Sequence, residues 1–314
     1  LTITVPNSTE ETLTHFPVLI TEANIPEAFW DYVIDGTDLV PTDTSNVELD
    51  RELVDIDTIA HTLEMYVAVD LAPGNNTFRL WFGDASKTTS NTTDVWDSNF
   101  VFVSHMNDNP LDSTQILDST SNANHGTKGA GDAAPTEVDG LMGKAQSFDG
   151  IDDVIQLPIM SNSTLTVESL YYSDGTSYGT IINLGYFGLE RGQVFYVDPN
   201  EQVVFRASNA GLQSIVGGLS VADSYNYISA STVSDETIFG INNNIYSKDS
   251  VSLPLLSGTT LNHFNIGLQN WNLWYMKGIQ CESRISSTAR GTGWISTTNN
   301  SMQESGFTVT GDYS

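Results

Sequence analysis

The sequence predicts an all-β protein made of two antiparallel β-sandwich domains, and three observations lead to this fold class. Apolar and polar residues alternate along many short segments, with the period of a strand that is buried on one face. Clusters of Gly, Asn, Asp and Pro separate these segments at short intervals. Helical periodicity never persists beyond two turns, and short helical turns are expected only near residues 287–296.

The clearest pair of strands lies in the first third of the chain. Residues 62–69 place four apolar side chains on one face, namely Leu63, Met65, Val67 and Val69. The turn-forming segment APGNN follows at residues 72–76, and alternation resumes at residues 77–82. The two segments are therefore expected to form an antiparallel hairpin with a five-residue loop.

The other expected strands continue this pattern to the end of the chain. They cover residues 15–20, 99–106, 153–158, 165–172, 179–189, 193–197, 202–208, 225–231, 236–241, 263–268 and 277–285. A polar stretch poor in aliphatic residues interrupts them at residues 83–98, and the strand pattern resumes at Asn99. We therefore expect two domains, at residues 1–97 and 98–314.

Charge limits the classes of partner. The chain carries 39 acidic residues against 11 basic ones, a formal net charge of −28, which would repel nucleic acid and anionic membranes but attract Ca²⁺. No apolar run approaches the roughly 18 residues of a membrane span, so membrane insertion is not expected. The single cysteine, Cys281, cannot form an intramolecular disulfide. The chain lacks an initiator Met, as expected after processing or truncation.

Several motifs of the second domain resemble the LamG-like jelly rolls of the concanavalin A-like lectin/glucanase superfamily. Their order and spacing hold across nearly all of residues 99–300, in HMND (105–108), DSTSNANHG (118–126), GKAQSFDGIDDVIQLP (143–158), LTVESLYY (165–172), YNYISASTVSDETIFGINNNIYS (225–247) and GIQCESRISSTARGTGWISTTNN (278–300). The resemblance implies that the second sandwich is a jelly roll.

The first domain resembles an uncharacterised β-domain that often precedes such jelly rolls. The matching segments are residues 13–20, 49–58, 63–86 and 95–100. Proteins with this pair of domains are typically surface, secreted or virion proteins, including bacteriophage structural proteins and adhesin-like modules. The pairing implies an extracellular or virion-surface location.

The segment SFDGIDDVIQLP (147–158) holds three aspartates, and they allow two interpretations. In the structural one, the Asp149 carboxylate caps local backbone N–H groups, Gly150 takes a positive φ, and Asp152 and Asp153 flank the start of a strand. In the other, the segment contributes to a cation site.

The resemblance implies Ca²⁺ at a rim of the sandwich. Because Ca²⁺ takes six to eight oxygen ligands, Asp152 and Asp153 would have to meet a second segment that offers Asp118 and Asn122. Cys281 stands where the family has an aspartate on its late strand, which removes any ion site that used that carboxylate.

A catalytic alternative rests on ELDRE (48–52), which mimics a shortened glucanase motif with Glu48, Asp50 and Glu52 on one strand face. Arg51 stands where that motif requires an apolar residue facing the core. The segment also lies outside the jelly-roll match. A solvated strand face is therefore the expected role, and no catalytic residue is assigned.

The candidate carbohydrate-binding residues lie in LQNWNLWYMKG (268–278), an expected hairpin loop. They are Asn270, Trp271, Asn272, Trp274 and Tyr275, because an exposed indole offers a flat apolar face to the C–H groups of a pyranose and amides bind its hydroxyls. In the alternative, Trp274 and Tyr275 pack onto the sheet and only Trp271 is free.

These inferences predict a non-catalytic extracellular or virion surface protein, a structural or decoration component with carbohydrate adhesion as a further role. Its expected partners are a glycan or the protein surface of a capsid or filament, and it is a candidate homo-oligomer. The alternatives are a dedicated glycan-binding, lectin-like adhesin and, second, a glucanase-type glycoside hydrolase.

Overall fold

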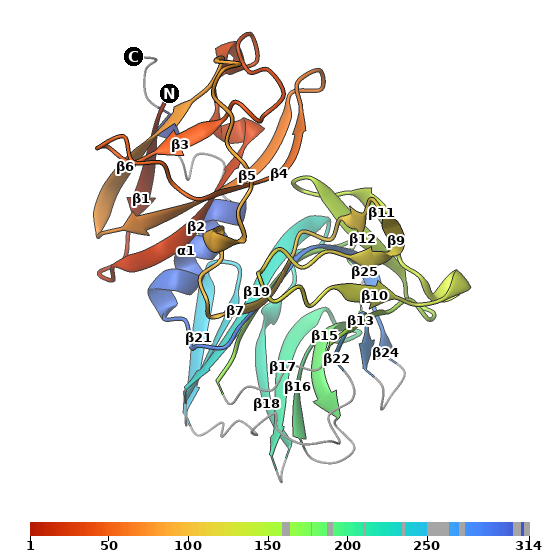
Figure 1. Ribbon diagram of the computed structural model, residues 1–314. Helices are drawn as coiled ribbons and strands as arrows, with labels where there is room; N and C mark the ends of the chain where they lie inside the picture. Colours follow the sequence, from red (N-terminus) through yellow and green to blue (C-terminus); the bar gives the residue numbers. More distant parts are fainter. Residues whose placement is uncertain are drawn as a thin grey trace. The chain divides into compact units, whose positions relative to one another are not determined.

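The computed structural model describes residues 1–158, 164–176, 178–186, 191–209, 212–233, 236–249, 264–269, 274–303 and 309–310. Its contacts group the chain into two compact units, which are described separately (Figure 1). Unit 1 comprises Leu1–Ser98 and Gly293–Ser314, and unit 2 comprises Asn99–Thr292. The main strand pairs of both units are antiparallel, which confirms the all-β fold class. Among the described residues, no helix is long and apolar enough to cross a membrane.

The described residues of unit 1 form two sheets. The four-stranded sheet has the order β26-β1-β6-β3, and the three-stranded sheet has the order β2-β5-β4. The strand bounds are β1 (Thr2–Asn7), β2 (Leu13–Thr21), β3 (Val40–Thr42), β4 (Arg51–Asp57), β5 (Thr62–Leu71), β6 (Gly74–Trp81) and β26 (Val309–Thr310), with 3-10 turns at Glu22–Asn24, Glu27–Phe29 and Thr93–Val95. Alternate apolar residues of β1 and β6 are almost completely buried, including Ile3, Val5, Phe78 and Leu80.

The C-terminal segment belongs to unit 1 by its contacts, whereas the sequence placed the whole of residues 98–314 in the second domain. The helix α1 (Thr292–Gln303) buries Trp294, whose ring lies edge-on to Phe16 with 4.8 Å between centroids. Beyond it, β26 pairs with β1. An aromatic contact and a strand pairing thus join this segment to unit 1.

The hairpin expected over residues 62–82 is wrong, because β5 and β6 belong to different sheets. β5 lies between β2 and β4, so both of its hydrogen-bonding edges are occupied. The chain leaves that sheet at Ala72, where the Asn76 side chain accepts from Ala72 N at 2.9 Å and donates to Ala72 O at 2.8 Å. β6 then pairs with β1 and β3.

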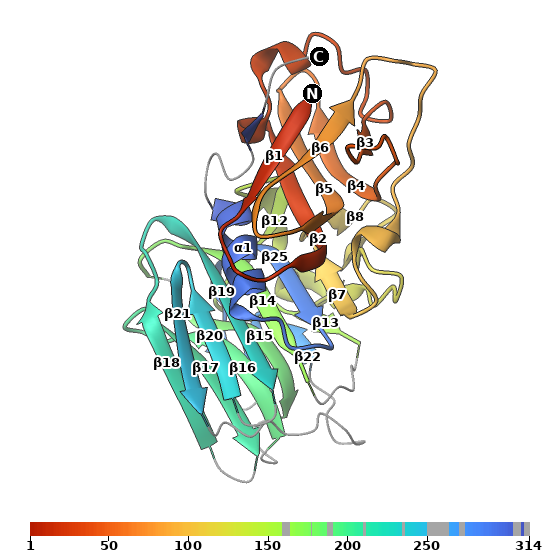
Figure 2. The ribbon, with the colours of Figure 1, turned by 90° about the vertical axis from the view of Figure 1, so that its left-hand side faces the viewer.

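In its described residues, unit 2 has two layers, whose large sheets contain nine and eight strands (Figures 1 and 2). The first has the order β18-β17-β16-β15-β22-β13-β10-β9-β8, and the second has the order β11-β12-β25-β14-β19-β20-β21 with β7 paired to β25. The bounds are β7 (Phe100–Ser104), β8 (Asp108–Asn109), β9 (Asp112–Ile116), β10 (Gly126–Lys128), β11 (Thr136–Asp139), β12 (Lys144–Asp149), β13 (Ile155–Leu157), β14 (Thr166–Ser173), β15 (Gly179–Tyr186), β16 (Arg191–Val197), β17 (Gln202–Asn209), β18 (Leu212–Leu219), β19 (Ser224–Val233), β20 (Glu236–Ile241), β21 (Asn244–Asp249), β22 (Phe264–Ile266) and β25 (Lys277–Ser286), with a 3-10 turn at Gly131–Ala133.

One continuous apolar core joins these two sheets. β16 and β17 supply Phe195 and Phe205 to it, with ring centroids 4.9 Å apart. Burial of such a side chain stabilises the fold by about 1.5–3 kcal/mol. Because side chains alternate along a strand, Tyr196 and Arg206 project from the opposite, outer face of the nine-stranded sheet.

Candidate functional site

The outer face of the nine-stranded sheet carries an aromatic cluster, which we call the outer aromatic cluster: Val194, Tyr196, Val204, Arg206 and Trp274. The rings of Tyr196 and Trp274 meet edge-on, with 5.3 Å between centroids. The Arg206 guanidinium lies 5.3 Å from the centroid of the Tyr196 ring, and its Nη2 donates to the Tyr196 hydroxyl at 3.0 Å. Trp274 is partly exposed, so the cluster presents an indole and a guanidinium that contact the same Tyr196 ring.

The register of β16 and β17 builds this cluster. Val194 lies opposite Arg206, and Tyr196 lies opposite Val204, so the four side chains share one face. Burial raises the pKa of Tyr196, and the charge of Arg206 partly offsets the rise. Tyr196 therefore stays a neutral phenol at physiological pH and can hold Arg206 through its oxygen.

Two of the five predicted carbohydrate-binding residues lie in the described part of the chain. Trp274 and Tyr275 form the short strand β24 (Trp274–Tyr275), which pairs with β23 (Leu268–Gln269), and both are partly exposed. Trp274 also packs on the sheet. It is therefore neither fully exposed, as a binding platform would be, nor fully covered, as in the alternative in which it only packs on the sheet. The other three, Asn270, Trp271 and Asn272, lie outside the described residues.

The predicted calcium ligands of the loop 118–126 hold their own loop in place. The Asp118 carboxylate is buried and accepts from four donors: Val103 N, Thr120 N, Thr120 Oγ1 and Asn124 N, at 2.8–3.0 Å. Asn122 Nδ2 donates to Phe100 O at 2.9 Å. These bonds surround Asp118 with hydrogen-bond donors, so its carboxylate fits a structural role better than a metal-ligating one.

The turn geometry expected for SFDGIDDVIQLP is present in the structure. Asp149 Oδ1 accepts from Ile151 N at 2.7 Å, Gly150 has a φ of +82°, and the buried Asp153 accepts from Asp149 N at 2.7 Å. The same turn gathers the carboxylates of Asp149, Asp152 and Asp153, each offering one oxygen within 4.8 Å of the others. Burial raises the pKa of Asp153, the two neighbouring carboxylates add to the rise, and the bond from Asp149 N opposes it.

The acidic residues of the glucanase-like segment ELDRE (48–52) lie in different environments in the structure. Glu48 and Asp50 line a cavity of about 340 Å³ in unit 1, together with His15 and Asp70. Glu52 instead accepts from Trp96 Nε1 at 2.6 Å, and Arg51 is buried. The shared strand face that the motif requires is thus replaced by two separate environments.

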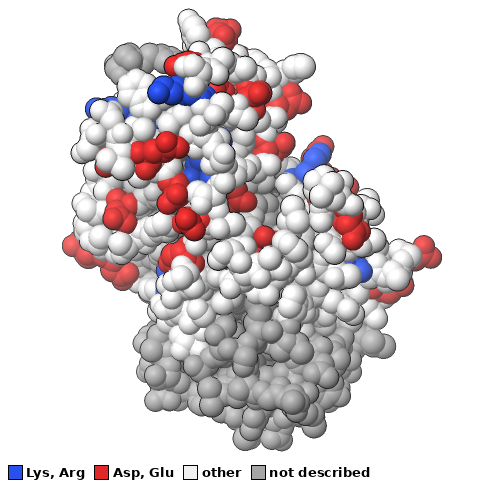
Figure 3. Space-filling view, viewed as in Figure 1, with Lys and Arg blue, Asp and Glu red and all other residues white. Residues whose placement is uncertain are grey.

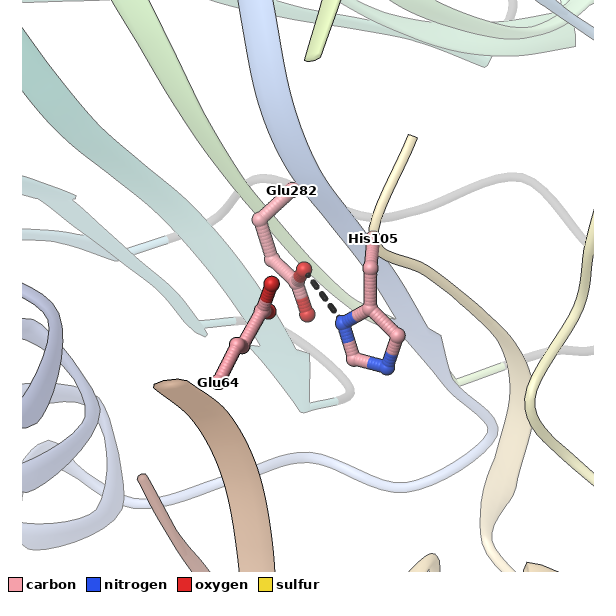
Figure 4. A group of neighbouring side chains, drawn as sticks. All are labelled: Glu64, His105 and Glu282. Carbon is pink, nitrogen blue, oxygen red and sulfur yellow. Dashed lines mark hydrogen bonds and ion pairs between the residues drawn. The ribbon is translucent and has the colours of Figure 1, made fainter. Parts of the chain in front are cut away.

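Unit 2 also contains a buried ion pair. His105 Nδ1 lies 2.9 Å from Glu282 Oε2 (Figure 4). Arg284 Nε donates to Glu282 Oε1 at 2.8 Å. Glu64, drawn with His105 and Glu282, belongs to unit 1. Within unit 2, one carboxylate therefore neutralises a guanidinium and orients an imidazole.

Comparison with known proteins yields structural neighbours only. No protein-family model and no curated protein matches the chain. Domain 4 of AbnA, a GH43 extracellular arabinanase from Geobacillus stearothermophilus solved in complex with arabinotriose, is 19% identical with a TM-score of 0.50, over 63% of this chain and 97% of that chain. This likeness supports the all-β fold.

Two toxin domains are less similar to the chain. The binding domain of Paraclostridial Mosquitocidal Protein 1 is 14% identical over 65% of this chain and 52% of that chain, with a TM-score of 0.49. The botulinum neurotoxin type G receptor binding domain is 10% identical over 65% of this chain and 51% of that chain, with a TM-score of 0.47.

Proposed function

We propose that this protein is a non-catalytic binding protein of an extracellular or virion surface, and that unit 2, a LamG-like jelly roll, binds carbohydrate through the outer aromatic cluster. The observation that carries the proposal is the partly exposed Trp274, which meets edge-on the same Tyr196 ring that the Arg206 guanidinium contacts. An indole provides the apolar platform for a pyranose face, and Arg206 provides donors for its oxygens.

The fixed positions of these side chains favour binding. Tyr196 is restrained by the hydrogen bond from Arg206, and Trp274 packs on the patch formed by Val194, Tyr196 and Val204. Because these side chains are already ordered, little conformational freedom is lost when a ligand arrives. Most of the favourable free energy of the contacts between ligand and protein therefore contributes to affinity, because little of it offsets the ordering of side chains.

A glycan array of the full chain tests the proposal, with arabinotriose included among the neutral and acidic oligosaccharides. We expect binding that Trp274→Ala weakens by about tenfold, the loss that removal of roughly 1.4 kcal/mol of contact would produce. The matched control is Leu111→Ala, which removes a 94% exposed apolar side chain of the same unit and should leave binding unchanged. Equal binding by Trp274→Ala and the parent chain would contradict the proposal.

A structural role on a particle is the second candidate, and the net charge of −28 favours it because such a surface resists nonspecific aggregation. In this role the protein decorates a capsid or filament as a homo-oligomer and needs no glycan. Absence of binding on the array, together with copurification on particles and a discrete oligomer in light scattering, would support it. Release of reducing ends from a β-glucan that Glu48→Gln abolishes would instead support the glycoside hydrolase alternative.

Calcium is proposed as an ancillary ligand of the turn that holds Asp149, Asp152 and Asp153. Three carboxylates supply only part of the six to eight oxygens that Ca²⁺ takes, so backbone carbonyls and water would complete the shell. Calorimetric titration with CaCl₂ tests this, with Asp152→Asn as the variant that should weaken binding and Asp112→Asn as an exposed control. Heat signals that do not differ between the two variants would contradict the site.

A further inference from the structure

A second cavity, which we call the Trp81 cavity, lies entirely within unit 1. Its volume is about 370 Å³, and the residues that carry its chemistry are Thr42, Asn46, Glu48, Trp81, Asp84 and Lys87. It lies where β3 forms the edge of the four-stranded sheet and β6 ends at Trp81. Small-molecule sites span roughly 300–1,000 Å³, so the cavity is at the lower end of that range.

Trp81 is held in a fixed orientation although it is exposed. Its Nε1 donates to Thr42 Oγ1 at 2.9 Å across the β3–β6 pair, and Thr42 is buried. The residue nevertheless remains 46% exposed. Because the indole N–H already has a partner, the exposed part of the ring offers apolar surface to a ligand.

Hydrogen bonds connect the loop that follows Trp81 to other segments of unit 1. Gly83 N donates to Asp38 Oδ2 at 2.7 Å, and Thr89 N donates to Thr37 O at 2.9 Å. The buried Arg51 donates from Nη2 to Thr89 O at 2.6 Å. The wall of the cavity is therefore set before a ligand arrives, which lowers the entropic cost of binding.

The polar groups of the cavity include both acceptors and donors. Glu48 is exposed and accepts from Thr89 Oγ1 at 2.7 Å, and Asp84 accepts from Ser86 N at 2.9 Å. Asn46 Oδ1 accepts from Arg79 Nη1 at 3.1 Å, which leaves its amide group as a donor, and Lys87 adds an exposed ammonium group. Sugar hydroxyls both donate and accept, so they match this mixture.

The charged side chains that line the cavity favour some ligand charges over others. An anion would face Glu48 and Asp84, on a unit whose visible charged side chains are mainly acidic (Figure 3). A cation would gain from the carboxylates but would be repelled by Lys87, and it would leave the donors of Asn46 and Lys87 unused. A neutral ligand with hydroxyl groups and an apolar face meets all of these groups without an unpaired charge.

We propose that the Trp81 cavity binds a neutral pyranose, with its C–H face on Trp81 and its hydroxyls among Glu48, Asp84 and Asn46. The site is separate from the outer aromatic cluster and does not depend on it. The protein would then hold saccharide through both units, which raises its avidity for a surface that displays many copies of the sugar.

Saturation-transfer NMR on the full chain tests this site. The probes are the methyl pyranosides of glucose, galactose and mannose, each at about 10 mM to detect millimolar affinity. Glucosamine and N-acetylneuraminic acid serve as the cationic and anionic comparators. The measurements are made on the folded Trp274→Ala chain, which removes the indole of the outer aromatic cluster. We expect at least one neutral pyranoside still to bind, and the additional substitution Trp81→Ala to weaken it by about tenfold.

Glu48→Gln provides a variant of an exposed side chain that should keep the fold, as judged by far-ultraviolet circular dichroism. It should weaken the neutral pyranoside by about threefold, since it replaces a charged acceptor with an amide. The proposal is overturned if no neutral pyranoside binds to the Trp274→Ala chain, or if glucosamine or N-acetylneuraminic acid binds to it more tightly. It is also overturned if adding Trp81→Ala or Glu48→Gln to the Trp274→Ala chain, with the fold kept, leaves binding unchanged.

Discussion

Replacement of Asp118 by alanine should destabilise unit 2 strongly, although Asp118 lies in a loop. The buried Asp118 side chain accepts from Val103 N at 2.9 Å on β7, and from Thr120 N at 3.0 Å and Asn124 N at 2.8 Å in its own loop. It also accepts from Thr120 Oγ1 at 2.9 Å. The variant therefore removes the group that joins this loop to the sheet.

The magnitude follows from the environments of the four donors. The Thr120 hydroxyl can rotate to another acceptor, and Asn124 N is only partly buried and can bind water. The buried N–H groups of Val103 and Thr120 lose their bonds to Asp118, and each such loss costs about 1–3 kcal/mol. With the lost charge-assisted bonds, the expected destabilisation is about 3–5 kcal/mol, near the upper end for single substitutions.

Differential scanning calorimetry of the full chain measures this effect. For a domain of the size of unit 2, the loss corresponds to a fall of roughly 6–20 °C in its transition temperature. The matched control is Asp112→Ala, which removes an exposed carboxylate that accepts from Thr114 N at 3.1 Å, and it should change the transition by less than about 2 °C. A change for Asp118→Ala within the range of this control would refute the reasoning. Calcium-dependent stability lost only in Asp118→Ala would instead assign Asp118 to a metal site.

Three further predictions concern unit 2. Gly267→Ala should cost about 2–4 kcal/mol in urea unfolding, because φ is +88° and the new Cβ would lie 2.5 Å from Phe148, whereas Gly131→Ala, with φ of +62° and open space, should cost only about 1 kcal/mol. Asp153→Asn should raise the unfolding temperature at pH 7, because it removes a buried negative charge that lies beside two other carboxylates. The difference should disappear as the pH falls through the raised pKa of Asp153, because protonation then removes the same charge from the parent chain. An equal effect at pH 7 and at a pH of about 4 would contradict this. Burial raises the pKa of Tyr171, so stability should decline as the pH rises above about 10, where the unfolded chain ionises, and Tyr171→Phe should reduce that decline in alkaline unfolding experiments.

Periodicity predicted the strands well but not their partners. The alternation in residues 62–69 and 77–82 indicated two strands, and β5 and β6 cover nearly all of them. Alternation within a segment does not reveal which edge of which sheet it joins, however. The hairpin prediction failed because β2 and β4 occupy both edges of β5, and these pairings are set by the tertiary structure.

The helix α1 was underestimated for a different reason. Its sequence, TGWISTTNNSMQ, is rich in Thr, Ser and Asn, which have low helix propensity. The signal that could have found it is the spacing of Trp294, Thr298 and Met302, which recur every four residues and are all buried. Packing of this face stabilises a helix that the local sequence alone would not favour.

In the candidate site too, the sequence indicated individual residues but not which residues lie together. The sequence identified Trp274 as an aromatic residue suited to a sugar, but not Tyr196 or Arg206, since their proximity depends on the register of β16 and β17. It also proposed Asp118 as a calcium ligand in a polar loop. Composition could not reveal that backbone donors occupy that carboxylate.

The path of the chain has a consequence for how the two units stay joined. Unit 2 begins at Asn99 and ends at Thr292, so the polypeptide passes between the units twice. Near these crossings, Ser287 N donates to Asn99 O at 2.7 Å, which holds the two ends of unit 2 close together. A protease that cuts one crossing leaves the other peptide connection intact, so release of unit 2 from unit 1 requires two separate cleavages.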